Sequence, residues 1–141
     1  RGYTLNAEKA ISKSEMVLLA AYELPRLDYR SGETLSVTLI WQAMQSSVQN
    51  YTVFVHLTRP DGSPVTQHDG LPANGTRPTD TWSPGDQITD AHQLSIPPDT
   101  LPGEYWLRVG MYGGAGRLPV TDPGQGTAAD DTVVLRSIVV R

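Results

Sequence analysis

The stretch from residue 50 to residue 69, NYTVFVHLTRPDGSPVTQHD, restricts the fold more than any other part of this sequence. Its first half alternates between apolar and more polar residues, and side chains along a β-strand point to opposite faces with a period of two. One face carries Tyr51, Val53, Val55 and Leu57, and the other carries Thr52, Phe54, His56 and Thr58. An isolated strand pair is marginal in water, so the apolar face must be covered by a second layer.

A tight turn and a returning strand complete this hairpin. Pro60 presets φ for the first position of a turn, and Gly62 accepts the positive φ that a tight reversal requires. We expect the return strand over residues 65–69. Pro64 has no N–H to donate to a neighbouring strand, which indicates either a strand start or a sheet edge at this point.

Similar patterns predict further strands along the chain. They cover residues 16–24, 34–43, 87–96, 104–112 and 132–140, with a short strand over 117–120. The first of these runs is apolar throughout and would also suit a short helix, but its length and the stop at Pro25 favour a strand. Alternation places Leu35, Val37, Leu39 and Trp41 on one face, and Tyr105, Leu107, Val109 and Met111 on another.

Seven to eight short strands with no convincing helix predict an all-β fold, an antiparallel β-sandwich of immunoglobulin-like or jelly-roll type. The 141 residues favour a single domain over residues 16–141, with residues 1–15 as a lead-in or linker. The 13 glycines and 11 prolines are spread between the strands, as turn residues are. The sequence LPGEY before the strand at 104–112 resembles a tyrosine corner, in which Tyr105 would bond back across the turn.

Composition excludes several functions. The chain has no cysteine, which excludes disulfides, zinc–thiolate sites and thiol catalysis. Its net charge of −4 argues against nucleic acid as a partner. No apolar run is long enough to span a membrane. Because the chain starts at Arg1 without an initiator methionine, we expect it to be a piece of something longer.

Two histidine–aspartate pairs are candidates for a polar cluster. His68-Asp69 ends the hairpin, and Asp90 and His92 share a face with Ile88, Leu94 and Ile96. These groups could converge on a metal ion, or they could form hydrogen bonds that pin the long loop at 71–86 to the rim of the sandwich. The mixed character of the face predicts that Asp90 lies near that rim. Scattered aspartates leave calcium open, but no ligand spacing supports a site, so we predict no metal and no cofactor.

No catalytic motif is present. The sequence lacks GxSxG, and both Ser63 and Ser83 lie beside prolines in turns. A pair of catalytic carboxylates depends on spatial geometry that spacing does not reveal. We therefore predict that the domain is not an enzyme.

The faces opposite the core carry the candidate binding residues. If the valines and leucines face inward, then Phe54 and His56 face outward on one strand, and Trp106, Arg108 and Tyr112 on another. Aromatic rings stack on the C–H faces of sugars, and Arg and His supply hydrogen bonds, so this pattern suits a sugar-binding platform. The alternative is that a long loop or another domain covers these rings. The loop residue Trp82 is a further tentative ligand contact, although it would also serve as a plug that holds its loop down.

Several of these segments together resemble a known group of domains. They are FVHL, PDG, QHD, the W-x-PGD and D-x-H-x-L segments, and PGEYWLRVGMY, within residues 16–120. They resemble β-sandwich domains appended to glycosyltransferase-like multi-spanning membrane proteins of the Chloroflexi. This implies an extracytoplasmic domain of unassigned role. A second resemblance is to immunoglobulin-like carbohydrate-binding domains of polysaccharide exporters, which implies recognition of a glycan.

We therefore predict a non-catalytic accessory module of a larger bacterial cell-envelope protein. Its expected partners are a cell-envelope glycan and the remainder of a membrane-anchored parent chain, and its expected location is the cell surface. The alternative is a structural or protein-interaction domain that packs on its own parent chain through Phe54, Trp106 and Tyr112.

Overall fold

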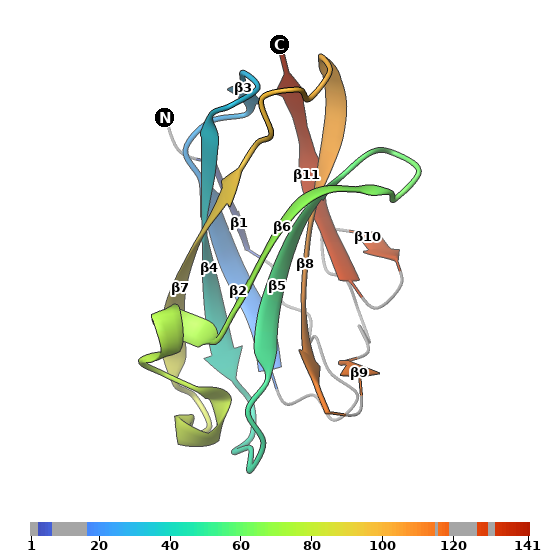
Figure 1. Ribbon diagram of the computed structural model, residues 1–141. Coiled ribbons are helices and arrows are strands. Elements are labelled where there is room, and N and C mark those ends of the chain that lie inside the picture. Colours follow the sequence, from blue (N-terminus) through green and yellow to red (C-terminus); the bar gives the residue numbers. More distant parts are fainter. Residues whose placement is uncertain (1–2, 7–16, 115, 119–126, 130–131) are drawn as a thin grey trace.

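The computed structural model describes residues 3–6, 17–114, 116–118, 127–129 and 132–141, and its long elements are all strands (Figure 1). The seven long ones are β2 (Val17–Leu24), β4 (Thr34–Ala43), β5 (Thr52–Thr58), β6 (Pro64–Gly70), β7 (Gln87–Ser95), β8 (Gly103–Gly113) and β11 (Thr132–Val140). The short ones are β1 (Tyr3–Asn6), β3 (Asp28–Tyr29), β9 (Gly116–Arg117) and β10 (Thr127–Ala129), and two 3-10 turns are η1 (Pro72–Gly75) and η2 (Thr79–Thr81). The all-β prediction is confirmed.

The strands form two sheets whose order is immunoglobulin-like. The smaller sheet has the order β1-β2-β4-β7, and the larger has β10-β11-β8-β5-β6, with β3 and β9 attached to β11 and β8. In chain order, the seven long strands correspond to the immunoglobulin strands A, B, C, C′, E, F and G. The smaller sheet is then A-B-E and the larger is G-F-C-C′, which is the immunoglobulin arrangement with one added edge strand, C′. This order decides between the two sandwich types that the sequence left open.

Among the described residues, neither 3-10 turn has the length and apolar character needed to cross a membrane.

The strand boundaries follow the hydrophobic alternation closely. β4 and β11 have the predicted bounds, and the run at 16–24 forms a strand rather than a helix. β6 lies at a sheet edge, as Pro64 indicated. β1 pairs with β2 and falls within the stretch that the sequence left as a lead-in. The predicted short strand at 117–120 lies partly outside the described residues; within them, β9 covers Gly116–Arg117.

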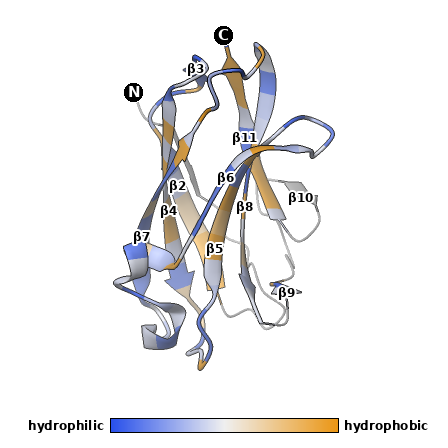
Figure 2. Ribbon diagram, in the orientation of Figure 1, coloured by the Kyte–Doolittle hydropathy of each residue, from blue (hydrophilic) through white to orange (hydrophobic). Residues whose placement is uncertain are grey.

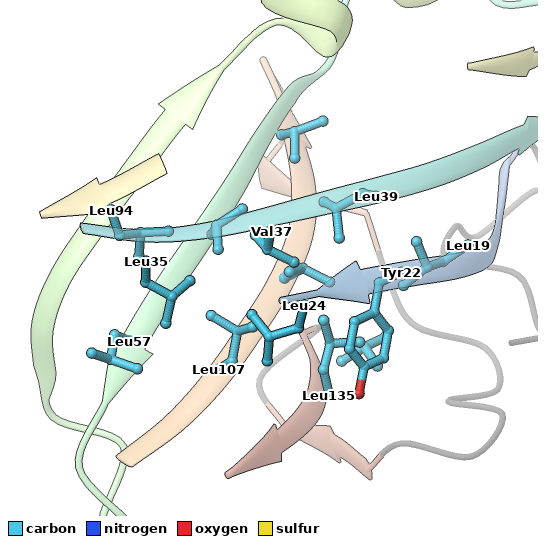
Figure 3. Close-up of a cluster of buried hydrophobic side chains, with 14 of the residues drawn as sticks. Leu19, Tyr22, Leu24, Leu35, Val37, Leu39, Leu57, Leu94, Leu107 and Leu135 are labelled. Atoms are coloured by element: carbon cyan, nitrogen blue, oxygen red, sulfur yellow. The ribbon is translucent and has the colours of Figure 1, made fainter. Parts of the chain in front are cut away.

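The core lies between the two sheets, as the parity of the strands requires. The smaller sheet contributes Leu19, Tyr22, Leu24, Leu35, Val37, Leu39 and Leu94, and the larger contributes Leu57, Leu107 and Leu135, all buried (Figure 3). Figure 2 shows the apolar residues concentrated on strands that face this interior, whereas the edge strand β6 is largely hydrophilic. Burial of these apolar side chains is the main stabilising contribution.

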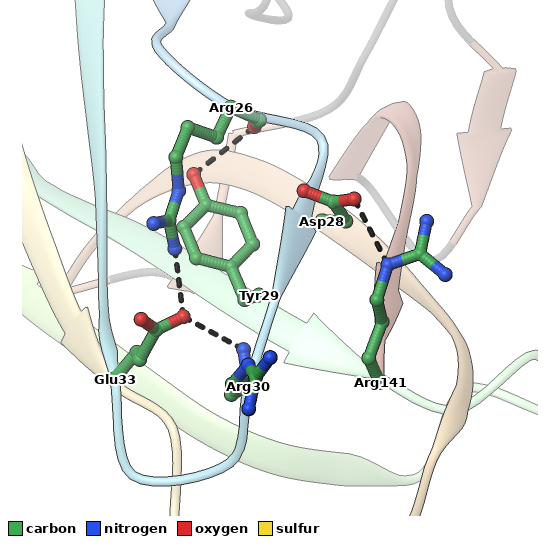
Figure 4. Close-up of polar contacts among 6 residues, drawn as sticks. All are labelled: Arg26, Asp28, Tyr29, Arg30, Glu33 and Arg141. Atoms are coloured by element: carbon green, nitrogen blue, oxygen red, sulfur yellow. Dashed lines mark hydrogen bonds and ion pairs between the residues drawn. The ribbon is translucent and has the colours of Figure 1, made fainter.

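A crossing loop joins the two sheets at one end of the sandwich. After β2, the chain leaves the smaller sheet, and β3 pairs in parallel with the end of β11 in the larger sheet. Glu33 accepts hydrogen bonds from the Arg30 N–H at 2.7 Å and from Arg26 Nη2 at 2.8 Å, and Arg141 Nε donates to Asp28 at 3.0 Å (Figure 4). Exposed ion pairs of this kind contribute at most about 1 kcal/mol each. They therefore shape the loop more than they stabilise the fold.

The predicted tyrosine corner is present. The Tyr105 hydroxyl donates to the Leu101 carbonyl oxygen at 2.6 Å, and the Tyr105 ring is buried near the start of β8. β8 is the F strand of the immunoglobulin order, which is where such a corner occurs. The bond fixes the turn that leads into the strand carrying Trp106, Arg108 and Tyr112.

Candidate functional site

The candidate site is the face of the larger sheet that points away from the core. His56 on β5 lies directly opposite Arg108 on β8 and Gln67 on β6, so the three side chains form a row across three strands. We call this surface the outer face. Its residues are Phe54, His56, Gln67, Asp69, Trp106, Arg108 and Tyr112, and the inward or outward direction predicted from the sequence is confirmed for the β5 and β8 members.

A hollow of about 210 Å³ opens on the outer face. The functional groups that line it are those of His56, Thr58, Gln67, Arg108, Arg117 and Thr132, with the hairpin turn at Gly62 and Pro64 on one side. Pockets for drug-sized ligands are larger, about 300–1,000 Å³. The hollow therefore suits one small polar unit, such as a single sugar ring or its substituent.

Arg108 is oriented by its neighbours. Its Nε donates to the Thr58 hydroxyl at 2.9 Å, and Thr58 is itself buried. Gly62 lies close by with φ +92°, and a Cβ built there would lie 3.8 Å from Arg108 Nη2. The turn therefore approaches the guanidinium closely, and both Gly62 and Arg108 line the hollow. An Arg held through Nε can present its two Nη groups to a ligand as a fork.

His56 is half-buried beside these cations. Burial lowers the pKa of its imidazole below the ordinary 6.5, Asp69 opposes this shift, and Arg117 and Arg108 add to it. The ring is therefore neutral at pH 7. A neutral imidazole offers one donor and one acceptor, which suits a sugar hydroxyl.

We expect the pH titration of His56, followed by NMR, to have a midpoint below 6.5. Because the folded pKa is lower than the unfolded value, the unfolded chain binds the extra proton, and folding is favoured while the ring is neutral. This stability contribution is complete above about pH 6.5 and is lost as the pH falls toward the folded pKa. A His56→Gln variant should lose less stability between pH 7.5 and 5 than the parent does. A midpoint above 6.5 would contradict the burial argument.

A hydrogen-bonded edge borders the outer face on the side of β6. The Tyr112 hydroxyl donates to Asp69 Oδ2 at 3.1 Å, and Gln67 Nε2 donates to Asp69 Oδ1 at 3.2 Å. The bond to Asp69 raises the pKa of the Tyr112 phenol, so the phenol stays protonated. Asp69 therefore holds Tyr112 and Gln67 in place at one end of the outer face.

Phe54 points outward as predicted, but neighbouring side chains cover its ring. Its ring is only 1% exposed. It lies 4.8 Å from the His56 ring and 6.2 Å from the Tyr112 ring, between centroids, and the Arg117 guanidinium covers it at 4.7 Å. Its neighbours use the ring as packing surface, so the predicted contact between Phe54 and a ligand would require Arg117 to move.

Trp82 is likewise a structural residue. Its indole is 4% exposed, belongs to the core, and donates through Nε1 to the Arg77 carbonyl oxygen at 2.9 Å. It holds the loop at 71–86 against the sandwich, so its burial supports the interpretation of Trp82 as a plug rather than as a ligand contact. Trp106, by contrast, is half-buried at the far end of the outer face, between Thr58 and Ser137 in the register.

The sequence reasoning missed Gln67 and Arg117. Gln67 could have been found from the hairpin register, because a residue opposite His56 must share its face. Arg117 follows a Gly-rich turn after β8, and β9 pairs with Tyr112 and Gly113. That short pairing returns Arg117 over Phe54, and no pattern in the sequence indicates it.

Only His68 of the first histidine–aspartate pair meets the second pair, on the inner side of the sheet edges, whereas Asp69 lies on the outer face. Asp90 is fully buried rather than at a rim, and its Oδ2 accepts from Trp41 Nε1 at 3.0 Å and lies 2.7 Å from His92 Nε2. Its Oδ1 accepts from the Ala73 N–H at 2.9 Å. His68 Nδ1 lies 2.9 Å from His92 Nδ1, which joins β6 to β7 across the two sheets. The group, which we call the Asp90 cluster, fits the pinning interpretation.

The loop that the Asp90 cluster pins has unusual backbone geometry. Ala73 and Asn74 have φ of 54° and 56°, in the left-handed region that non-glycine residues rarely adopt. The carboxylate of Asp90 holds the Ala73 N–H and so maintains this conformation. Within the described ranges, no group of three or more His, Asp or Glu side chains is arranged to hold a metal ion.

Comparison with known proteins identifies the fold only. No protein-family model matches the chain, and no curated protein matches it. Among solved structures, it is similar to the C-terminal domain of Wzt, with 14% identity and a TM-score of 0.57 over 100% of this chain and 77% of that one. A family 123 glycoside hydrolase from Clostridium perfringens matches with 9% identity and a TM-score of 0.34 over 99% of this chain and 26% of that one, which supports no argument.

The likeness to the Wzt domain shows a shared β-sandwich fold. This fold agrees with the β-sandwich that both resemblances imply. The resemblance to domains of Chloroflexi membrane proteins is not supported by these comparisons and stays a prediction. At 14% identity, no residue role passes from one chain to the other.

Proposed function

We propose that this domain is a non-catalytic module that binds carbohydrate on its outer face. The observation that carries the proposal is the row of His56, Arg108 and Gln67 around one hollow, with Trp106 and Tyr112 on the same face. Convergent polar groups in a concave surface are the default sign of a ligand site.

The chemistry of the row suits sugar hydroxyls. Neutral His56 and the Gln67 amide each offer donors and acceptors, and Arg108 offers donors only. Trp106 and Tyr112 are six residues apart on β8, which corresponds to roughly 20 Å at about 3.3 Å per residue. An extended glycan of a few units could therefore contact both aromatic side chains and place one unit over the hollow between them.

The biological setting that we propose rests on the sequence resemblances. The module would serve a larger bacterial cell-envelope protein, outside the cytoplasm, as the resemblance to domains of Chloroflexi membrane proteins implies. Recognition of a glycan chain is what the resemblance to polysaccharide-exporter domains implies, and the shared fold with the Wzt domain is consistent with it.

Fewer structural observations support the alternative of a protein-interaction domain. It needed Phe54, Trp106 and Tyr112 as an apolar docking surface. Phe54 is already covered by Arg117 of this chain, and Tyr112 is engaged with Asp69. The register neighbours of Trp106 are the polar residues Thr58 and Ser137, whereas the buried centres of interfaces are more apolar than their rims.

The test is calorimetric titration of the domain with cell-envelope oligosaccharides chosen from a glycan array. We expect Trp106→Ala to weaken binding about 5–10-fold, because a stacking contact is worth about 1 kcal/mol beyond its buried area. Arg141→Ala is the matched control, since Arg141 is exposed and pairs with Asp28 away from the outer face. Absence of binding to any array glycan would overturn the proposal. Association of the domain with its parent chain that Trp106→Ala weakens would favour the alternative.

A further inference from the structure

We propose that the sugar unit bound over the hollow carries an anionic group, a carboxylate, sulfate or phosphate, which the Arg108 guanidinium holds. This inference rests on the proposed carbohydrate binding and specifies its ligand class. It follows from the charge, the hydrogen bonds and the burial around the hollow.

The charge of the hollow is opposite to that of the chain. The whole sequence has a net charge of −4, yet the described residues that line the hollow include two arginines, Arg108 and Arg117, and among them is no aspartate or glutamate. His56 is neutral there, in part because these two cations lower its pKa. A concave surface with one sign of charge attracts ligands of the other sign.

Two acidic side chains near the hollow, among the residues that the structure describes, are engaged elsewhere. Asp69, on the outer face beside the hollow, accepts from Tyr112 through one oxygen and from Gln67 through the other. Asp61, in the hairpin turn, accepts from the N–H and the hydroxyl of Ser63 at 2.9 and 2.7 Å. Neither carboxylate neutralises Arg108 through a hydrogen bond, and neither lines the hollow.

Arg108 has the geometry of an anion-binding side chain. Its Nε bond to Thr58 fixes the plane of the guanidinium, and Thr58 is 2% exposed, so this anchor is rigid. The Nη groups then remain for a bidentate contact with two oxygens of one anion, the arrangement that Arg forms with carboxylates and phosphates. Arg117 stays over the Phe54 ring at 4.7 Å and adds positive charge at the same hollow.

The experiment compares ligands that differ only in charge. Oligogalacturonides are titrated against their methyl esters, and a sulfated galactan oligosaccharide against its desulfated form, alongside the acidic and neutral members of a cell-envelope glycan array. We expect an acidic ligand to bind at least about tenfold more tightly than its neutral partner, as for a charge-assisted bidentate contact. The preference should shrink as salt is raised, because the hollow is open to solvent.

Variants at position 108 decide whether Arg108 is responsible. Arg108→Gln should remove the preference for the acidic ligand, Arg108→Lys should keep part of it, and Arg141→Gln should leave it unchanged. Equal binding of acidic and neutral ligands, or binding of neutral glycans alone, would overturn this inference and leave carbohydrate binding standing. A preference that survives in Arg108→Gln would also overturn the assignment to Arg108. If no glycan binds, the proposed function fails, and this inference fails with it.

Discussion

Replacement of Asp90 by alanine is expected to lower the free energy of unfolding by about 3–5 kcal/mol, as removal of one partner from a buried charged network does. Asp90 is 0% exposed and is the common acceptor for groups of three elements, Trp41 on β4, Ala73 in η1 and His92 on β7. Without the carboxylate, these donors stay buried without partners, at a cost of about 1–3 kcal/mol each. Domains are stable by about 5–15 kcal/mol, so the variant would lose a large part of its stability.

Urea unfolding at pH 7 measures this effect, with Asp28→Asn as the matched control. Asp28 forms an exposed ion pair with Arg141, so its loss should cost less than about 1 kcal/mol. Hydrogen exchange measures the local effect, since in Asp90→Ala the Ala73 amide should lose protection before the amides of the core strands do. A change below about 1 kcal/mol for Asp90→Ala would show that water replaces the carboxylate at no cost and that the Asp90 cluster does not hold the loop.

The hydrophobic alternation predicted most of this fold because the sheet face to which each side chain points depends only on its position along its own strand. In a two-layer sandwich, each strand has one face in the core, so the positions of Leu35, Val37 and Trp41 already determine which residues face outward. The same rule placed Arg108 and His56 on one surface. The strand order was not predictable in this way, because it depends on which strands pair across long separations in sequence.

The errors in the predicted site concern burial rather than direction. Phe54 does face outward, but alternation cannot show that Arg117, sixty-three positions later in the chain, returns to cover it. The mixed character of its face predicts that Asp90 lies near a rim, but a carboxylate can be buried where hydrogen bonds surround it. The sequence marks His92 as a neighbour of Asp90, but it does not mark the other two donors, Trp41 and Ala73.

The burial of Phe54 leads to the second large expected effect. Phe54→Ala should lower the free energy of unfolding by about 3–5 kcal/mol, the range for loss of a buried aromatic side chain. The ring is 1% exposed and is the packing surface shared by His56, Tyr112 and Arg117. Val48→Ala is the control, since Val48 is 97% exposed and surface substitutions stay within about 0.5 kcal/mol.

Phe54→Leu separates support of the site from contact with the ligand. Leucine keeps most of the buried apolar volume, so this variant should remain folded with a smaller loss of stability than Phe54→Ala. If Phe54 only supports the outer face, glycan affinity in Phe54→Leu should stay within about threefold of the parent, a difference below about 0.7 kcal/mol, whereas Trp106→Ala loses more. A folded Phe54→Leu variant that loses as much affinity as Trp106→Ala would mean that the ligand displaces Arg117 and stacks on Phe54 itself. Because both readouts come from one folded protein, stability and binding cannot be confused in this comparison.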